Sequence, residues 1–288
     1  MATAQIAELL TGDKLYQQRA RQALPILIRQ AQAEKPITYE NLASELKMPN
    51  PRNLNYVLGS IGQALNNLSD AWGERIPPVQ CLVVNKNTGL PGEGIGWFIK
   101  DIADYNKLSK RQKRQVIDAE LARICSYAKW KKVLKEFGLK PAKQDFSQFN
   151  AKASAVVGRG RGESKAHLEL KKFVLSNPSA IGLPTTTKKC EAEHILPSGD
   201  IIDVFFEYKK EHIGVEVKPE NSDVADITRG LYQCIKYQAV LEGRLAAIGK
   251  PQNVRTFLVL GGPLPVELVP LKNILGVNVF ENMKQVIG

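Results

Sequence analysis

Two apolar segments on either side of residue 210 constrain the fold of this chain most. Residues 201–208 and 213–218 are rich in β-branched and aromatic side chains, and a polar segment at 209–212 separates them. Two such runs joined by a short polar turn predict a β-hairpin. Asp203 interrupts the first run, and a carboxylate inside a sheet is costly unless it has a partner or a metal ion. The alternative is a strand-end aspartate in water.

The second strand of this hairpin is expected to end with Glu216 and Lys218. Side chains alternate along a strand, so these two lie on one face. A turn centred between Lys210 and Glu211 places Asp203 across from this end. The Glu-x-Lys spacing alone means little, because it also occurs at 45–47, 169–171 and 207–209. The hairpin context distinguishes the fourth copy and predicts two carboxylates and a lysine at one edge of the sheet.

A cluster of this kind suits phosphodiester hydrolysis. Mg²⁺ is held by one or two carboxylates and keeps several waters, and a bound metal ion activates water and neutralises charge. A nearby ammonium group can orient the attacking water or stabilise the negative charge of the transition state. The three side chains are therefore candidates for metal-assisted hydrolysis.

Asp203, followed after twelve residues by Glu216-x-Lys218, resembles the pattern of the PD-(D/E)XK, or restriction-endonuclease-like, nuclease superfamily. The resemblance implies an α/β fold with a central mixed sheet flanked by helices. It also implies that Asp203 and Glu216 bind Mg²⁺ or Mn²⁺ and that Lys218 is the catalytic lysine. Ile202 stands where the name-giving proline would be, but many branches lack that proline. Asp200 is a second candidate for the role of Asp203, with a poorer spacing.

The superfamily often takes a further glutamate from the first helix, here expected at 163–175. Glu163 falls near the centre of the apolar stripe of this helix, whereas Glu169 points to the side. We therefore expect Glu163 to be a third metal ligand, with a favourable helix-dipole position as the alternative. His167, near the edge of the same face, is a candidate contact to the site or to a DNA phosphate, and a structural role is the alternative. The stripe is formed by Ala166, Leu170, Phe173 and Val174.

A helix expected at 226–241 carries Gln233 and Tyr237 on one stripe, because residues four apart are neighbours on a helix. Gly230 on that stripe would allow close approach. Some PD-(D/E)XK branches have a Gln-x-x-x-Tyr motif here that contacts the substrate or the lysine, so the resemblance implies catalytic roles for Gln233 and Tyr237. Ordinary core or surface use is the alternative. Further strands are expected at 256–260 and 277–280, and alternating strands and helices predict an α/β sandwich.

The first hundred residues predict a winged helix. A short helix at 37–46 is followed by a turn in which Asn50 is a good N-cap and Pro51 suits the first helical turn. The next helix repeats leucine and isoleucine at spacings of three and four residues, which defines one buried face. The apolar run 79–84 and the Gly-rich return after it predict a hairpin. The second helix of such a unit can enter a major groove, so the candidate contacts to nucleic acid are Arg52, Asn53 and Asn55.

The segments Thr38-Tyr39-Glu40-Asn41-Leu42-Ala43 and Asn50-Pro51-Arg52, with the Gly-rich wing, resemble the DNA-binding domain of the alkyltransferase-like proteins. The true alkyltransferases have a reactive Pro-Cys-His-Arg sequence. Cys81 lacks the following His-Arg, so dealkylation is not predicted. The alternative to DNA contact is a helix-turn-helix used only for packing.

Residues 101–162 are expected to connect the two parts. Ser109 can cap a helix that runs to about Phe137, with Gly138 as its stop. The helix is strongly basic, which fits either a solvated face or a face that follows DNA phosphates. Residues 140–162 are expected to be a linker. The candidate phosphate contacts are Lys110, Arg111, Lys113 and Arg114.

Composition agrees with a polyanion partner. The net charge is +11 and the isoelectric point is near 9.4, which favours nucleic acids through counterion release. Four scattered cysteines argue against zinc knuckles and redox pairs and fit reduced thiols. No apolar run approaches the roughly 20 residues that span a bilayer, and the first residues lack the pattern of a signal peptide. We expect a cytoplasmic protein with no membrane partner.

The expected organisation is a winged helix at 1–100, a basic connector at 101–162 and a nuclease domain at 163–288. The expected function is Mg²⁺- or Mn²⁺-dependent endonucleolytic hydrolysis of DNA. Two alternatives remain: a non-catalytic DNA-binding regulator with a degenerate nuclease fold, and an RNA-directed nuclease. Many members of the superfamily act as dimers, which leaves a homodimer open by analogy.

Overall fold

The computed structural model describes residues 7–99, 104–142, 145–155 and 164–283. The chain forms two compact units, Met1–Gln144 and Asp145–Gly288. Each unit has its own hydrophobic core, so the two are described separately. Within the described residues, no helix has both the length and the hydrophobicity to cross a membrane.

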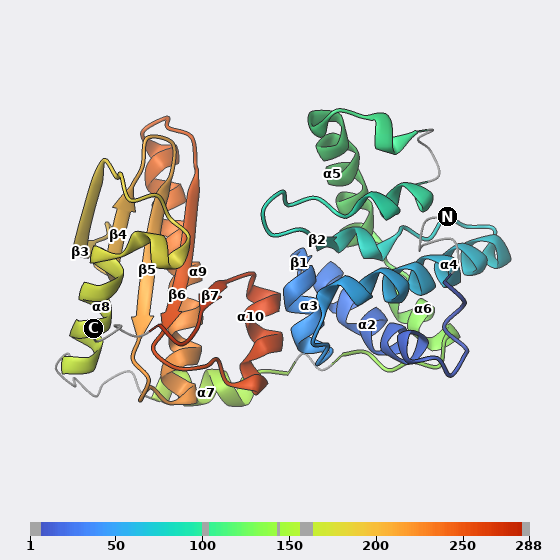
Figure 1. Ribbon diagram of the computed structural model, residues 1–288, viewed down its shortest axis with the longest axis horizontal. Helices are drawn as coiled ribbons and strands as arrows, with labels where there is room; N and C mark the ends of the chain where they lie inside the picture. Colours follow the sequence, from blue (N-terminus) through green and yellow to red (C-terminus); the bar gives the residue numbers. More distant parts are fainter. Residues whose placement is uncertain (1–6, 100–103, 143–144, 156–163, 284–288) are drawn as a thin grey trace. The chain divides into compact units, whose positions relative to one another are not determined.

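The second unit is built on a five-stranded mixed sheet with strand order β3-β4-β5-β6-β7 (Figure 1). The first three strands are antiparallel, and the last three are parallel. The mixed α/β architecture predicted from the sequence is confirmed, although β3 was not predicted. The strands are β3 (Lys189–Ile195), β4 (Ile201–Glu207), β5 (His212–Lys218), β6 (Val254–Leu260) and β7 (Asn278–Phe280).

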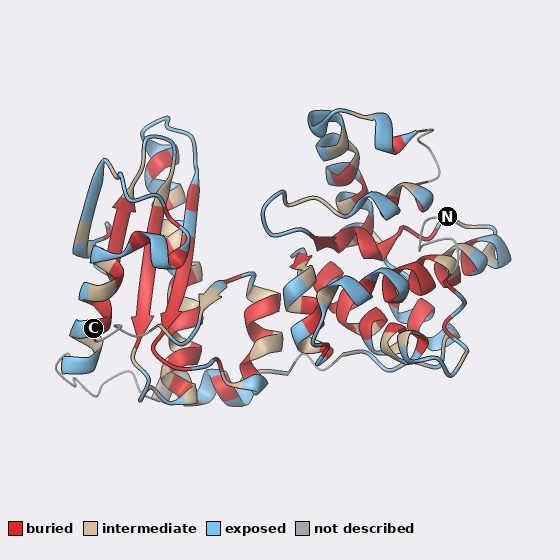
Figure 2. Cartoon of the chain, viewed as in Figure 1, coloured by how far each residue is buried: buried red, intermediate tan, exposed pale blue. Residues whose placement is uncertain are grey.

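Helices cover both faces of this sheet, which explains why its central strands are almost continuously apolar. On one face, α8 (Lys165–Ser176) packs Leu170 and Val174 against Val215 and Val217. On the other face lie α9 (Val224–Ala247), α10 (Val269–Leu275) and α7 (Ser147–Ala155). Figure 2 shows the buried residues running along β4, β5 and β6.

The first unit contains the predicted short helix, turn and second helix. Thr38 caps α3 (Tyr39–Glu45) by accepting a hydrogen bond from the Asn41 N–H. Asn50 accepts from the Arg52 N–H at 3.0 Å and begins a short 3-10 turn that leads into α4 (Leu54–Trp72). The apolar face of α4 packs against α2 (Leu15–Gln32).

The hairpin predicted after α4 is wrong for the described residues. β2 (Val83–Val84) pairs in parallel with β1 (Ile37–Thr38), and Glu93–Trp97 forms a 3-10 helix. The reason is burial: the whole run from Val79 to Val84 lies inside the core, where a solvent-exposed wing has no place. The Gly-rich segment instead packs beside Tyr39, whose hydroxyl accepts a hydrogen bond from the Gly92 N–H at 3.0 Å.

The predicted connector is wrong too, because most of it belongs to the first unit. The single helix expected from Ser109 is two helices, α5 (Lys110–Ser126) and α6 (Trp130–Glu136). Ile117, Ile124 and Trp130 lie in the core of the first unit, and the Trp130 indole N–H donates to the Ile124 carbonyl at 2.9 Å. The predicted cap at Ser109 is confirmed. The described part of the expected linker includes α7, which belongs to the second unit.

We predict that Ile117→Ala lowers the free energy of unfolding of the first unit by about 3 kcal/mol, because it leaves a cavity in the core. All three tryptophans, Trp72, Trp97 and Trp130, lie in this unit. Denaturant unfolding of the full chain, followed by tryptophan fluorescence, therefore reports on this unit. The exposed Gln115→Ala on the same helix is the control. Equal midpoints for both variants would show that α5 is a connector after all.

Candidate functional site

The register of the β4–β5 hairpin brings Asp203 level with Glu216. The strands pair from Glu207 and His212 up to Val204 and Val215. The turn therefore centres between Lys209 and Lys210, one residue earlier than predicted. Continuing this register places Asp203 beside Glu216 rather than beside Lys218.

Beyond Val204 the backbone pairing with β5 gives way to a side-chain contact. Asp203 Oδ2 accepts a hydrogen bond from the Val217 N–H at 2.9 Å. A carboxylate thus occupies the place where a backbone carbonyl of a continuing strand would lie. This hydrogen bond satisfies both a buried N–H and a partly buried carboxylate, which removes most of the cost of placing Asp203 in the sheet.

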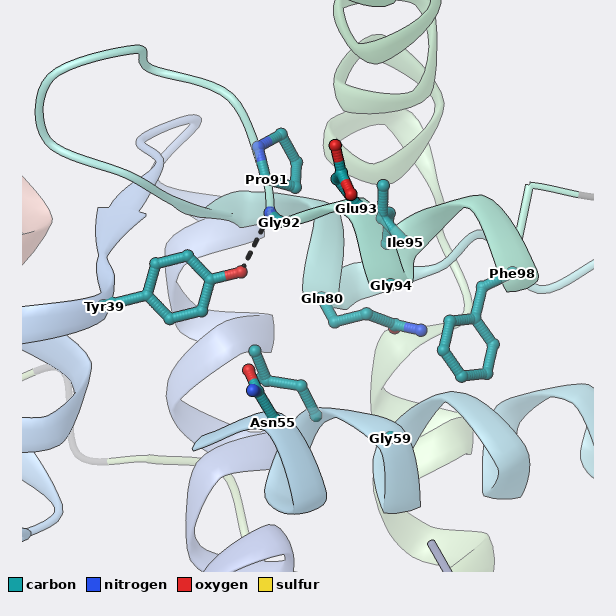
Figure 3. A pocket seen from close by; sticks show the side chains of 11 residues that line it. Tyr39, Asn55, Gly59, Gln80, Pro91, Gly92, Glu93, Gly94, Ile95 and Phe98 are labelled. Atoms are coloured by element: carbon teal, nitrogen blue, oxygen red, sulfur yellow. Dashed lines mark hydrogen bonds between the residues drawn. The ribbon is translucent and has the colours of Figure 1, made fainter. Parts of the chain in front are cut away.

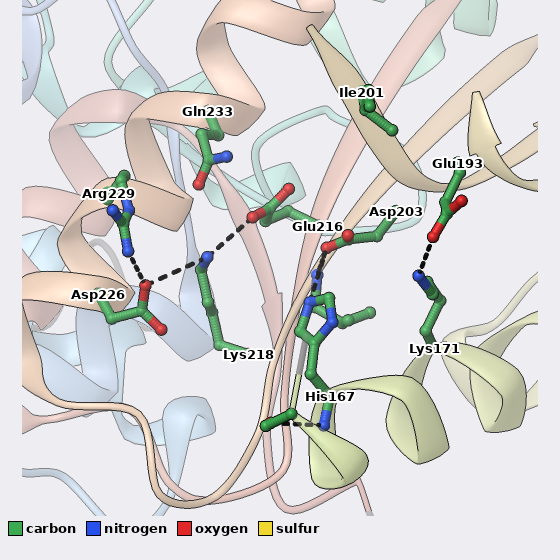
Figure 4. A network of polar contacts seen from close by, with 12 residues as sticks. His167, Lys171, Glu193, Ile201, Asp203, Glu216, Lys218, Asp226, Arg229 and Gln233 are labelled. Atoms are coloured by element: carbon green, nitrogen blue, oxygen red, sulfur yellow. Dashed lines mark hydrogen bonds and ion pairs between the residues drawn. The ribbon is translucent and has the colours of Figure 1, made fainter. Parts of the chain in front are cut away.

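Glu216 and Lys218 lie on the face of β5 that is turned toward α9, because Val215 and Val217 pack on the opposite face against α8 (Figure 4). Lys218 Nζ is 2.9 Å from Glu216 Oε1. The two side chains are only 9% and 4% exposed, so this ion pair is shielded from water. A shielded pair of this kind is held in a defined geometry.

One stripe of α9 lines the site. Asp226, Gly230, Gln233 and Tyr237 follow one another at helical spacing along it. A Cβ added to Gly230 would lie 3.0 Å from Lys218 Cε and 2.9 Å from Leu258 Cδ1, so a larger residue would require these two side chains to shift. The predicted close approach at Gly230 is confirmed.

Two residues of α9 were missed by the sequence reasoning. Asp226 Oδ1 lies 3.4 Å from Lys218 Nζ, and Arg229 forms an ion pair with the same oxygen. The signal was present, because Asp226 stands one helical turn before Gly230 on the stripe that carries Gln233. A first-turn aspartate is common in helices for reasons of capping and dipole, which hides such a role.

Gln233 and Tyr237 do interact with each other, as their spacing predicts. Gln233 Nε2 donates to the Tyr237 hydroxyl at 3.0 Å, and this hydroxyl donates to the Ile201 carbonyl at 2.9 Å. Tyr237 thereby ties α9 to β4. Gln233 Oε1 is buried and has no hydrogen-bond partner among the described residues, and its carboxamide lies on the same side as Glu216 and Lys218 (Figure 4).

Helix α8 contributes a histidine. His167 Nε2 lies 3.4 Å from Asp203 Oδ2, and the Ser164 hydroxyl caps the helix by accepting from the His167 N–H. Lys171, one turn later, is buried and pairs with Glu193 at 2.8 Å. Glu193 has a positive φ of 59°, and the β3–β4 register is the same on both sides of it.

Two expectations about α8 have different outcomes. Ala166 is exposed, so the buried stripe was misplaced at its first member, whereas Leu170 and Val174 are buried as predicted. The predicted third metal ligand, Glu163, lies outside the described residues, and its role stays a prediction.

The electrostatics of the site follow from burial. Burial raises the pKa of Glu216 to about 7, and the Asp203 carboxylate adds to this rise while Lys218 opposes it. Burial alone would lower the pKa of Lys218, but Glu216 and Asp226 raise it above its usual value. Burial also raises the pKa of Tyr237, and Glu216 raises it further. The site therefore holds a cationic lysine beside a carboxyl group that ionises near neutral pH.

Asp203 and Glu216 are the residues that could hold a divalent cation. Asp203 and Glu216 repel each other, and a cation between them would relieve both this repulsion and the burial of Glu216. The unpaired Gln233 Oε1 is a further acceptor that a metal-bound water could use. Within the described residues, no group of three or more His, Cys, Asp or Glu side chains is arranged to hold a metal ion. Two carboxylates are a set that could hold an ion such as Mg²⁺, which keeps several waters.

The candidate DNA contacts of the first unit differ in their surroundings. Arg52, Asn53 and Asn55 are exposed at the start of α4, as predicted. On α5, Lys110 and Arg111 are exposed.

Two of the four basic residues proposed on α5 have protein partners instead. Arg114 donates to the carbonyl oxygens of Thr88 and Gly89, so its guanidinium fastens a loop of its own unit. Lys113 is half-buried, with its ammonium 5.5 Å from the centre of the Tyr105 ring. Lys110 and Arg111 are therefore the better candidates for contact with a phosphate.

A cavity of about 410 Å³ in the first unit was not predicted (Figure 3). Tyr39, Asn55 and Phe98 contribute to its lining, and the Gln80 side chain is buried there with neither amide atom hydrogen-bonded among the described residues. Cys81, the next residue, is fully buried, and burial raises the pKa of its thiol well above the usual value. A buried thiol of high pKa is a poor nucleophile.

We predict that the metal-free second unit loses stability as the pH rises from about 4.5 to about 7. The folded pKa of Glu216 is raised above its unfolded value, so folding favours the protonated form, and this contribution fades through that window. Calorimetric melting in the presence of a chelator measures the effect. Glu216→Gln cannot ionise and should remove this part of the pH dependence, while Glu211→Gln, at the β4–β5 turn where Glu211 pairs with Arg255, should keep it. A Glu216→Gln profile that matches the wild type would contradict the assignment.

Comparison of this chain with family models, with curated proteins and with solved structures finds no significant match. The arrangement of Asp203, Glu216 and Lys218, together with the motifs that carry them, is therefore the basis on which a function is inferred.

Proposed function

We propose that the second unit is a metal-dependent nuclease that hydrolyses DNA phosphodiester bonds, and that the first unit binds duplex DNA. The observation that carries the proposal is the convergence of Asp203, Glu216 and Lys218 where β4 and β5 separate. The resemblance of this motif to the PD-(D/E)XK pattern supports it, as does the mixed sheet with helices on both faces.

Each side chain has a distinct task in this proposal. Asp203 and Glu216 would hold Mg²⁺ or Mn²⁺, which activates water and neutralises charge on the phosphate. Lys218 stays cationic and stabilises the negative charge that develops on the phosphate oxygens. Tyr237 and Gln233 keep α9 against β4, so that the strand ends keep their spacing. Burial of the Glu216–Lys218 pair excludes bulk water and strengthens these interactions.

A DNA substrate is favoured by the first unit. The exposed start of α4 presents Arg52, Asn53 and Asn55, and the exposed start of α5 presents Lys110 and Arg111. A helix N-terminus with polar and basic side chains is suited to a DNA groove or backbone. Competition between duplex DNA and RNA in one cleavage assay separates this proposal from an RNA-directed nuclease.

We predict that Lys218→Ala and Asp203→Ala each reduce cleavage of supercoiled plasmid in Mg²⁺ or Mn²⁺ by at least about 100-fold. DNA affinity, measured by fluorescence anisotropy, should change little, because the proposed duplex contacts lie in the other unit. Lys209→Ala is the matched control, since Lys209 ends another Glu-x-Lys sequence but is exposed in the turn.

The outcomes separate the proposal from its rival. Wild-type protein that binds DNA but neither nicks nor cuts any DNA form with either metal would favour the non-catalytic regulator. Lys218→Ala protein with wild-type cleavage would remove Lys218 from the mechanism.

We also predict that replacing both Lys110 and Arg111 by alanine weakens duplex binding. The slope of log affinity against log salt concentration should become less negative by about 2, one unit for each lost phosphate contact. Lys107→Ala is the control, because the Lys107 ammonium already pairs with Asp104 at 2.8 Å. An unchanged salt slope in the double variant would place the DNA elsewhere on the chain.

A further inference from the structure

Among the residues that the structure describes, the ammonium group of Lys218 has ion pairs with two carboxylates from different elements. Glu216 Oε1, on the same strand, lies 2.9 Å away, and Asp226 Oδ1, in the first turn of α9, lies 3.4 Å away. The side chain of Asp226 is 25% exposed, compared with 4% for Glu216. Of these two, Glu216 is level with Asp203 when the β4–β5 register is continued, so the two carboxylates do not have equivalent positions.

The two contacts respond differently to a divalent cation. A cation held by Asp203 and Glu216 draws on the oxygens of Glu216, and its double charge repels the neighbouring ammonium. A cation bound there would therefore weaken the contact between Glu216 and Lys218. Asp226 contacts Lys218 from α9, so its contact would remain.

Asp226 is itself held in place. Its N–H donates to the side chain of the N-cap residue Asp223 at 2.8 Å, and Arg229 pairs with the same carboxylate oxygen that faces Lys218. Gly230, on the next turn, lets the aliphatic stem of Lys218 lie against the helix. The first two turns of α9 thus contact both the ammonium group and the aliphatic part of Lys218.

We propose that Asp226 is a positioning residue that keeps the Lys218 ammonium at the scissile phosphate when the cation is bound to Glu216. This inference rests on the proposed nuclease function and adds to it a residue outside the metal-binding pair. Asp226 acts through Lys218 and does not touch the reacting atoms.

The competing explanation is that Asp226 only stabilises the start of α9, as first-turn acids do. Asp223 provides the matched control, because it is an acid at the same helix end that caps the backbone rather than holding the lysine. Asparagine is as good an N-cap as aspartate, so Asp223→Asn removes one negative charge from this end and keeps the cap.

The experiment compares wild type, Asp226→Asn, Asp226→Glu and Asp223→Asn in the full-length protein. Cleavage kinetics with Mn²⁺ are measured together with Mn²⁺ affinity by calorimetry. We expect Asp226→Asn to lower kcat by about 10- to 100-fold, the cost of misplacing a catalytic group by about 1 Å. Its KM for DNA and its Mn²⁺ affinity should stay within about twofold of wild type, because neither depends on the position of the Lys218 ammonium group. Asp226→Glu should recover part of kcat, and Asp223→Asn should match wild type.

A double-mutant cycle with Lys218→Ala tests whether Asp226 acts through the lysine. Once Lys218 is alanine, Asp226→Asn should cause no further loss of kcat under single-turnover conditions. Equal kcat in wild type and Asp226→Asn, or additive losses in the cycle, would overturn the inference. Equal losses in Asp226→Asn and Asp223→Asn would show a role in helix stability alone. Failure of the wild type to cleave would count against the nuclease function itself. This outcome is therefore distinct from one that contradicts only the role of Asp226.

Discussion

The hydrogen bond from the Val217 N–H to the Asp203 carboxylate is the interaction on which the site depends. It replaces backbone pairing at the point where β4 leaves β5, and so holds a carboxylate inside a sheet next to Glu216. Had the strands continued to pair, this N–H would have been satisfied by a carbonyl, and Asp203 would have needed another partner. The geometry proposed for metal binding is therefore a consequence of how one sheet satisfies its backbone donors.

Helix α9 contributes the remaining side chains of the site from the face of the sheet that it covers. Its stripe supplies Asp226 for the lysine, Gly230 for close packing and Tyr237 for the tie to β4. Opposite charges alternate from Glu216 through Lys218 and Asp226 to Arg229, which lets a poorly hydrated lysine remain charged. Buried ions of this kind are retained only where each has a partner.

Features that follow from local rules could be predicted from the sequence. Strand alternation placed Glu216 and Lys218 on one face, and capping chemistry identified Ser109 and Asn50. Features that depend on tertiary packing could not. The run 79–84 has the pattern of a strand in a wing, but the helices that bury it determine its conformation. Likewise, the contact between Asp226 and Lys218 requires the crossing of α9 over β5, which sequence spacing alone does not specify.

The absent side chain at Gly230 has a consequence beyond packing. A methyl group there would meet both Lys218 and Leu258, the first a member of the charged cluster and the second a member of the apolar core. The apolar core and the charged cluster therefore place the same demand on one position. A substitution there would require the Lys218 and Leu258 side chains to shift, so one change would disturb the charged cluster and the apolar core together.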